Sequence, residues 1–307
     1  MIYLLYQLCC QLIVAIGFRR KMMKLSVEIY SVAKKLGDYK SIELIKQAGF
    51  DAIDYSYYYE KECDQVLGEN YKEYAKEIRA HLDLVGISCN QAHAPFNFKY
   101  GMNRDLSEQK YLNIVRSMES ASILGAKNII VHSISVPEGV DFEEYNIQYY
   151  SSFIPYCEAF NIHVAVENLF KRDTKRNRII GKLGSPQELN RVIKKINSPW
   201  IVACVDVGHA ALTGYEPEDF IGQVDPHILK CLHVQDNDYL GDRHTLPYLA
   251  SLNWSAIMTS LKERGYEGDL TFEIVTYLER FPKELLPDAL KFAAVVGKHL
   301  VSICENS

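Results

Sequence analysis

The stretch "LSEQKYLNIVRSMESASILGAKNIIVHS", residues 106–133, contains one complete helix–turn–strand unit. Its first part repeats apolar side chains every three or four positions, which is the spacing of one face of a helix. Gly125 stands where a glycine commonly ends a helix. The run 127–133 is short, apolar and rich in β-branched residues, which predicts a buried strand, and His132 lies at its end.

The same unit recurs along the chain from Lys24 onward. Alternating strands and helices predict a parallel sheet with helices outside it. Eight such units within 307 residues predict a single-domain α/β fold, the (β/α)8 TIM barrel. An open, doubly wound sheet is the alternative, but no G-x-G-x-x-G turn follows an early strand. The expected strands are 24–31, 50–56, 84–93, 127–133, 162–168, 200–207, 228–235 and 269–275.

The composition is that of an ordinary globular protein. The 34 Lys and Arg residues against 39 Asp and Glu give a net charge of −5, so no basic field directs the chain to nucleic acid or to an anionic membrane. The eight cysteines form no C-x-x-C pair, which favours reduced, buried thiols over a disulfide framework. We therefore expect a cytoplasmic protein with no nucleic-acid or membrane partner.

Residues 1–22 differ from the rest of the chain. They are apolar from Ile2 to Phe18, interrupted by Gln7 and Gln11. The segment has no basic n-region and no small-residue cleavage site, and it is slightly short and too polar for a membrane span. We expect residues 1–22 to form an extension outside the fold and residues 23–307 to form the barrel, with a membrane anchor as the less favoured alternative.

Six successive predicted strands carry ionisable side chains at or just beyond their C-terminal ends. In a barrel these ends meet on one face, where active sites lie. Any one of these residues alone is as easily explained by a hydrogen bond in the core, but buried ionisable groups in such number need partners or a metal. Imidazole and carboxylate are ligands of divalent metals. The residues are His93, His132, Glu167, Asp206, His209, His233, Asp242, His244 and Glu273.

Five motifs around these positions carry a family resemblance. They are "AHAPFNF" (92–98), "VAVEN" (164–168), "VDVGH" (205–209), "HVQDND…DRHTLP…NW" (233–254) and "GYEGDLTFEI" (265–274). Over roughly residues 24–300 the chain resembles the xylose isomerase-like TIM-barrel superfamily. This is the sugar phosphate isomerase/epimerase group, which is related to the endonuclease IV type of apurinic endonuclease.

The resemblance implies roles for individual residues. In the ketose epimerases of this group four residues bind one divalent metal, and they correspond to Glu167, Asp206, His233 and Glu273, with Glu167 and Glu273 also catalytic. The histidine at the position of His209 contacts substrate. The endonuclease branch has ligands for further metals, which implies substrate or second-metal binding at His93, His132, His209, Asp242 and His244.

The sequence departs from the family at two points. Many members have a Pro-Gly-x-Gly turn after the position of His244, whereas this chain has "LPYLASLNW" at 246–254. The spacing from His233 to Asp242 is also tighter than in the endonucleases, which counts against a role on DNA.

These observations favour a metal-dependent sugar or sugar-phosphate isomerase/epimerase that transfers a proton through an enediolate. Three carboxylates and one imidazole suit Mn²⁺, Mg²⁺, Co²⁺ or Zn²⁺. The expected partner is a small sugar or sugar phosphate, and a homo-oligomer is compatible with this chain length. Three alternatives stay open: an apurinic endonuclease-like phosphodiesterase with up to three metals, a lyase or dehydratase acting on a polyol or modified sugar, and a binding protein with a relict site.

Three further residues are weaker candidates for substrate contacts. The segment 170–178 follows the fifth predicted strand and is basic, which makes Arg172 a candidate for a substrate phosphate or carboxylate. Asp173 is a candidate for a substrate hydroxyl, and Trp254 for the pocket wall.

Overall fold

The computed structural model describes residues 22–306 apart from 59–63, 97 and 174–176. The predicted N-terminal extension, except Met22, therefore lies outside the described residues. Among the described residues, no helix is both long and apolar enough to cross a membrane. The five cysteines in the described ranges are buried and form no disulfide with one another.

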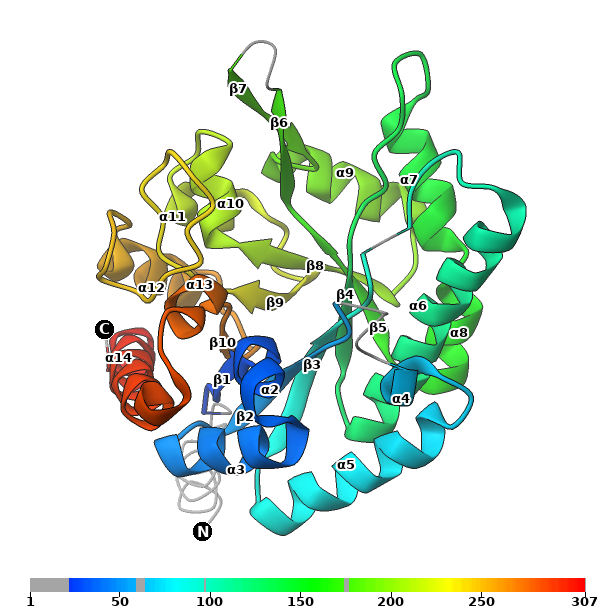
Figure 1. Ribbon diagram of the computed structural model, residues 1–307. Coiled ribbons are helices and arrows are strands. Elements are labelled where there is room, and N and C mark those ends of the chain that lie inside the picture. Colours follow the sequence, from blue (N-terminus) through cyan, green and yellow to red (C-terminus); the bar gives the residue numbers. More distant parts are fainter. Residues whose placement is uncertain (1–21, 59–63, 97, 174–176, 307) are drawn as a thin grey trace, which may run out of the picture.

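Eight parallel strands form a closed barrel, as the alternating pattern predicts (Figure 1). The order around the sheet is β10-β1-β2-β3-β4-β5-β8-β9. The ring closes between β9 and β10, where the Val234 N–H donates to the Thr271 carbonyl at 2.8 Å and the Glu273 N–H donates to the Val234 carbonyl at 3.1 Å. The strands are β1 (Leu25–Glu28), β2 (Ala52–Ser56), β3 (Ser88–His93), β4 (Asn128–Val131), β5 (His163–Glu167), β8 (Ile201–Asp206), β9 (Leu229–His233) and β10 (Leu270–Phe272).

Helices surround the strands, and the main apolar core lies between the two layers (Figure 1). Gly49 and Gly125 end α3 and α6 in the left-handed conformation, with φ of 104° and 98°. The outer helices include α3 (Asp38–Ala48), α5 (Tyr71–Val85), α6 (Arg104–Leu124), α7 (Phe142–Ser151), α8 (Ile154–Phe160), α9 (Pro186–Ile196), α11 (Pro217–Gln223), α12 (Trp254–Glu263) and α14 (Leu286–Asn306). Further helical segments are α2 (Tyr30–Leu36), α4 (Asp64–Leu67), α10 (Val207–Leu212), α13 (Val275–Glu279) and the 3-10 turn Lys283–Leu285.

The described residues of the basic segment 170–178 belong to a β-hairpin. Strand β6 (Leu169–Asp173) pairs antiparallel with β7 (Arg178–Lys182) outside the barrel sheet. Figure 1 shows this hairpin extending beyond the ends of the barrel strands.

The interior of the barrel changes character along the strands. A small apolar cluster fills part of it, made of Ile130, Ala165, Val202, Cys204 and Cys231. Alternate residues of a strand share one face, so the inward position two residues beyond Ala165 is Glu167, and the one beyond Cys204 is Asp206. The C-terminal end of the interior is thus polar and stands on an apolar floor.

Candidate functional site

Four predicted metal ligands meet at the C-terminal end of the barrel. Glu167, Asp206 and His233 are the last residues of β5, β8 and β9, and Glu273 directly follows β10. All four are at most 7% exposed. One ligand atom from each lies within 4.8 Å of the corresponding atoms of the other three.

Short contacts hold these four side chains. His233 Nδ1 lies 2.8 Å from Glu167 Oε1 and 3.4 Å from Glu273 Oε2. Asn168 fixes the backbone of Asp206 from both sides: the Asp206 N–H donates to Asn168 Oδ1 at 2.8 Å, and Asn168 Nδ2 donates to the Asp206 carbonyl at 2.9 Å. The Asp206 carboxylate also caps α10, because it accepts the His209 N–H at 2.7 Å.

A second group lies beside the first and consists of His209, Asp242 and His244. Their ligand atoms also lie within 4.8 Å of one another. His244 Nε2 is 3.0 Å from Asp242 Oδ2, and His209 Nε2 is 3.6 Å from Asp242 Oδ1. Gln235 joins the two groups, because its amide donates to both Asp206 and Asp242.

His244 has an unusual backbone. Its φ is +40°, in the left-handed region that non-glycine residues rarely adopt. The Gln235 side chain accepts the His244 N–H at 2.7 Å, and His244 Nδ1 lies 3.1 Å from the Glu273 carbonyl. Such a conformation persists only where surrounding contacts impose it, and these contacts point the His244 ring at Asp242 and Glu273.

The remaining two predicted histidines also reach the site. His132 Nε2 contacts Glu167 Oε2 at 2.9 Å. The His93 ring stacks on the His233 ring, with centroids 4.3 Å apart and planes inclined by 19°. The fold thus brings together all nine residues predicted from the strand ends.

The charges of the two groups are strongly coupled. Burial raises the pKa of Glu167, but contacts with His233, His132 and His209 outweigh burial and hold that pKa well below its usual value. Burial likewise lowers the pKa of His233, yet the carboxylates of Glu273 and Glu167 keep it well above the usual imidazole value. For Asp206 burial is the largest effect, and its pKa rises to about 6.

The same balance holds at the second group. Burial lowers the pKa of His244, but the carboxylates of Glu273, Asp242 and Asp206 raise it to about 10. Burial raises the pKa of Asp242, yet hydrogen bonds with His209 and His244 bring it far below its usual value. Positive charge on His233 and His244 therefore balances the negative charge of the surrounding carboxylates. The same negative charge would attract a divalent cation.

The donor set fits a divalent cation. His93 Nε2 and Glu273 Oε2 are buried, face the site and have no hydrogen-bond partner among the described residues. Buried polar atoms without partners are uncommon in folded proteins, and metal ligation is one way in which they are satisfied.

A cavity of about 390 Å³ opens above these side chains, a size suited to a small-molecule ligand. Glu167, His132, His209, Asp242, His244 and Glu273 lie in its wall, together with Tyr30, Tyr58, Phe96 and Phe170. The Phe96 ring stacks on His132 with centroids 4.8 Å apart. The Tyr58 hydroxyl donates to Glu273 Oε1 at 2.8 Å.

The three weaker candidates do not line this cavity. Trp254 is 2% exposed, and its indole N–H donates to Asp236 at 3.1 Å, so it packs beneath the loop that follows β9. Arg172 and Asp173 lie on β6, and the Arg172 guanidinium donates to the Leu240 carbonyl at 3.2 Å.

Several residues of the site were not predicted. Glu28 and Asp54 are buried carboxylates of β1 and β2, but neither lies at the end of the predicted strands 24–31 and 50–56, so the strand-end rule did not select them. Tyr58, Asn168 and Gln235 carry no comparable signal, because their roles depend on neighbours that are distant in sequence.

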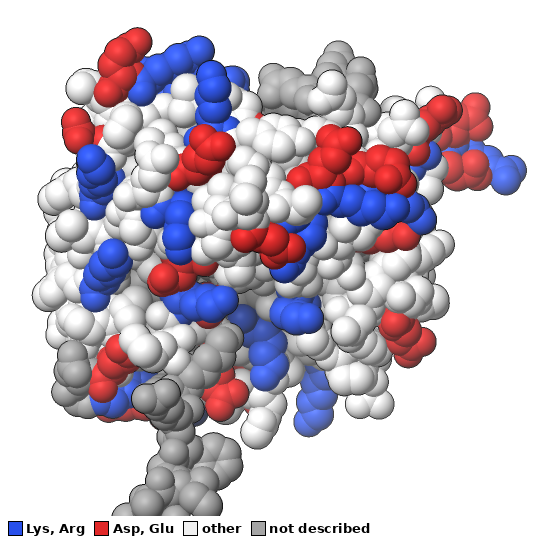
Figure 2. Space-filling model, turned by 90° about the horizontal axis from the view of Figure 1, so that it is seen from below, with Lys and Arg blue, Asp and Glu red and all other residues white. Residues whose placement is uncertain are grey.

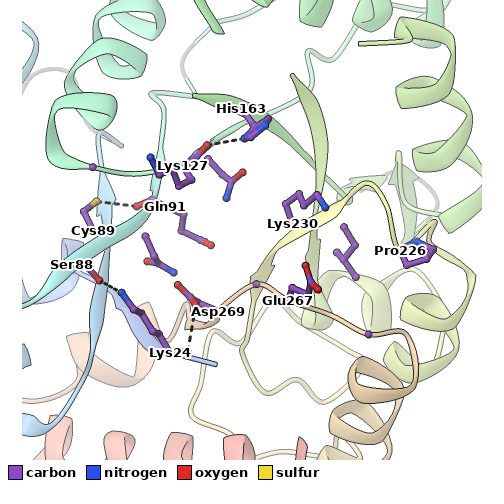
Figure 3. A pocket seen from close by; sticks show the side chains of 16 residues that line it. Lys24, Ser88, Cys89, Gln91, Lys127, His163, Pro226, Lys230, Glu267 and Asp269 are labelled. Carbon is purple, nitrogen blue, oxygen red and sulfur yellow. Dashed lines mark hydrogen bonds between the residues drawn. The ribbon is translucent and has the colours of Figure 1, made fainter. Parts of the chain in front are cut away.

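A second cavity, of about 440 Å³, lies at the opposite end of the barrel (Figure 3). Lys24, Lys127 and Lys230 line it together with Glu267 and Asp269. In Figure 3 the Lys24 ammonium is turned toward Ser88, to which it donates at 3.0 Å. The face in Figure 2 has basic and acidic side chains interspersed, without a continuous basic surface. None of the groups with metal-ligand geometry in the described residues lies at this end, which in TIM barrels serves stability.

Comparison with known proteins agrees with this architecture. The family model described as xylose isomerase-like TIM barrel matches residues 42–296. An uncharacterised protein of Methanocaldococcus jannaschii is 25% identical over 278 residues, covering 87% of this chain and 86% of that protein.

Two solved structures are similar in fold. A D-tagatose 3-epimerase-like protein superposes with a TM-score of 0.72 at 21% identity, covering 92% of this chain and 98% of that one. The IolI protein with a bound zinc atom superposes with a TM-score of 0.68 at 15% identity, covering 91% and 98%. The family model spans most of the chain, and this protein therefore belongs to the xylose isomerase-like TIM barrel family.

Proposed function

We propose that this protein is a metal-dependent isomerase or epimerase of a small sugar or sugar phosphate. The observation that carries the proposal is the convergence of Glu167, Asp206, His233 and Glu273 within 4.8 Å at the floor of a sugar-sized cavity. The similarity in fold to a D-tagatose 3-epimerase-like protein supports the same class of reaction.

In this proposal the four residues hold one divalent cation. A bound cation would supply Lewis acidity that stabilises negative charge on the oxygen of a substrate enediolate. Three carboxylates with one imidazole suit Mn²⁺, Mg²⁺, Co²⁺ or Zn²⁺. The thiols of Cys204 and Cys231 belong to the apolar cluster in the barrel interior and are not part of the donor set.

Glu167 and Glu273 transfer the proton. They come from β5 and β10, which are separated on both sides of the ring by other strands, so their carboxylates approach a bound sugar from different directions. One carboxylate removes the proton from the carbon next to the carbonyl, and the C–H electron pair moves into the enediolate. The other returns a proton to the opposite face, or the same proton goes to the adjacent carbon.

Contacts with Tyr58 and His132 orient the Glu273 and Glu167 carboxylates for proton transfer. The Tyr58 hydroxyl occupies Oε1 of Glu273 and leaves Oε2 without a hydrogen-bond partner among the described residues. His132 contacts Oε2 of Glu167, and its ring is partly exposed in the cavity wall, so it offers a route by which the proton exchanges with solvent.

The group His209, Asp242 and His244 either binds a second cation or holds substrate hydroxyls. Its geometry also keeps a second function open, an endonuclease IV-like phosphodiesterase that binds up to three ions. The observation that favours this alternative is that all nine imidazoles and carboxylates expected for three ions lie in one site.

The test begins with metal-stripped protein reloaded with Mn²⁺ and assayed against ketoses, aldoses and their phosphates in deuterated water. We expect turnover with solvent deuterium entering the substrate carbon, and about one tightly bound ion per chain by elemental analysis. About three ions together with cleavage of abasic DNA would favour the phosphodiesterase. Sugar turnover with no exchange, even in a single turnover, would exclude the enediolate route.

A further inference from the structure

We propose that Asp54 is a positioning residue that fixes the tautomer of His93, so that the electron pair of His93 Nε2 faces the cation site beside Glu273. The inference rests on the proposed metal-dependent function and assigns a part of the site that the strand-end pattern did not include. Asp54 and His93 are 0% and 1% exposed.

A β-bulge places the partners side by side. The register between β2 and β3 shifts after Ile53, so that Asp54 pairs with Gln91 rather than Asn90. Gln91 and His93 are two positions apart and share the inward face of β3. Bulges are frequent beside active sites, where they redirect side chains. Here the bulge sets both Gln91 and His93 against the Asp54 carboxylate.

Two hydrogen bonds then determine which ring nitrogen of His93 donates. Gln91 Nε2 donates to Asp54 Oδ2 at 2.9 Å. His93 Nδ1 lies 3.1 Å from Asp54 Oδ1, and an ionised carboxylate only accepts, so Nδ1 carries the proton of the neutral ring. The other ring nitrogen, Nε2, is left with its electron pair exposed.

The atoms around His93 Nε2 favour a bound cation. Nε2 is buried, has no hydrogen-bond partner among the described residues, and lies 3.7 Å from Glu273 Oε1. An imidazole electron pair and a carboxylate oxygen repel each other at that distance in a water-poor interior unless positive charge lies between them, either a proton on the ring or a metal ion that takes its place. His93 is therefore oriented as a donor toward the ion that Glu273 would hold.

Asp54 also faces the second imidazole of the stack. His233 Nε2 lies 3.7 Å from Asp54 Oδ2, while its Nδ1 faces Glu167. The Asp54 carboxylate thus lies beside His93 Nδ1 and His233 Nε2, while the other nitrogen of each stacked ring faces the site. A carboxylate behind a metal-binding histidine fixes the ring and raises its basicity, and its removal typically weakens metal binding about 10–100-fold.

The experiment uses Asp54→Asn and a compensating pair. With an amide at 54, we expect its oxygen to keep accepting the Gln91 NH₂, which leaves the Asn NH₂ facing His93 Nδ1 and forces the Nε2–H tautomer. The double variant Asp54→Asn/Gln91→Glu restores an acceptor for that NH₂ and lets the Asn oxygen accept the His93 Nδ1 proton, with the total charge unchanged. Ser26→Ala is the control, because it removes a different buried polar group of the barrel, a hydroxyl 2.8 Å from Asn90 Oδ1, without touching His93.

Two measurements are made on each protein. Mn²⁺ affinity is expected to fall about 10–100-fold in Asp54→Asn, recover in the double variant and stay unchanged in Ser26→Ala. Nitrogen NMR of the metal-free protein at alkaline pH, with the signals assigned by a His93→Gln variant, is expected to find the proton on Nδ1 in the wild type and the double variant, and on Nε2 in Asp54→Asn.

The outcomes separate this inference from the proposed function. A wild-type His93 that is protonated on Nε2 would overturn the role of Asp54, as would Mn²⁺ affinity that is unchanged in Asp54→Asn. A double variant that binds Mn²⁺ no better than Asp54→Asn would instead make Asp54 a direct ligand, and would also overturn its positioning role. A wild-type protein that binds no divalent cation would contradict the proposed function, and the NMR result alone would then decide the tautomer.

Discussion

Asp236 offers a test that needs neither substrate nor metal. It follows β9, is fully buried, and accepts four N–H groups. Oδ1 accepts the backbone N–H of Asn237 at 2.8 Å and of Leu252 at 3.1 Å, and Oδ2 accepts the Ala250 N–H and the Trp254 indole N–H, each at 3.1 Å. The perturbation is Asp236→Asn, which keeps the size of the side chain and replaces one oxygen by an NH₂.

The magnitude follows from these four contacts. Whichever way the Asn amide turns, its NH₂ faces two N–H donors that then have no acceptor. A buried donor left without a partner costs about 1–3 kcal/mol. We therefore expect the free energy of unfolding to fall by about 2–6 kcal/mol. The loop that these bonds close carries Asp242 and His244, so the second group of ligands loosens with it.

The assay is equilibrium unfolding in urea, followed by circular dichroism and by tryptophan fluorescence. The control is Asp288→Asn on the exposed first turn of α14, where the same chemical change is expected to stay within about 0.5 kcal/mol. A loss below about 1 kcal/mol for Asp236→Asn, with an unchanged denaturant slope, would refute the reasoning from buried donors.

Four further predictions concern the site and the fold. His233→Ala should lower Mn²⁺ occupancy measured by equilibrium dialysis, whereas the exposed His227→Ala should not. Glu273→Gln keeps an oxygen ligand but removes the base, so turnover should fall about 10²–10⁴-fold with a smaller loss of metal affinity, while Glu279→Gln in the same cavity wall serves as the control. Hydrogen bonds from Arg191 and Lys195 lower the pKa of Glu143 from 4.5 to about 2. The stability from this contact between α7 and α9 is therefore complete above pH 4.5 and lost as the pH falls toward 2, so the difference in urea midpoint between wild type and Glu143→Gln should vanish over that range. A chain that starts at Met23 should keep the wild-type urea midpoint and Mn²⁺ affinity, since we propose that residues 1–22 lie outside the barrel; loss of soluble protein would contradict this.

The barrel was predictable because its signals are local. In residues 106–133 the apolar spacing, the glycine at 125 and the β-branched run follow from backbone geometry within one unit. Repetition of that unit then leaves few topologies. The nine site residues were predictable for a related reason: parallel strands that end in ionisable groups must bring those groups to one face, wherever the individual neighbours lie.

The same local signals mislead where partners are far apart in sequence. Asp236 and Asp242 stand in one polar loop and look alike in the sequence, yet one carboxylate binds buried N–H groups and the other faces the cavity. Trp254 looked like a pocket residue for the same reason, but its indole N–H is directed to Asp236.

The β-bulge that pairs Gln91 with Asp54 is the clearest example of a contact that local sequence signals do not predict. The sequences of β2 and β3 contain no signal for the register shift, and without that shift Asn90 would pair with Asp54. Periodicity reports which side of a strand is buried, because that depends on the strand alone. Which groups meet across the barrel depends on strand register and on the path of the loops. Both are set by packing among segments up to some two hundred residues apart, such as Tyr58 and Glu273, which are joined by one hydrogen bond.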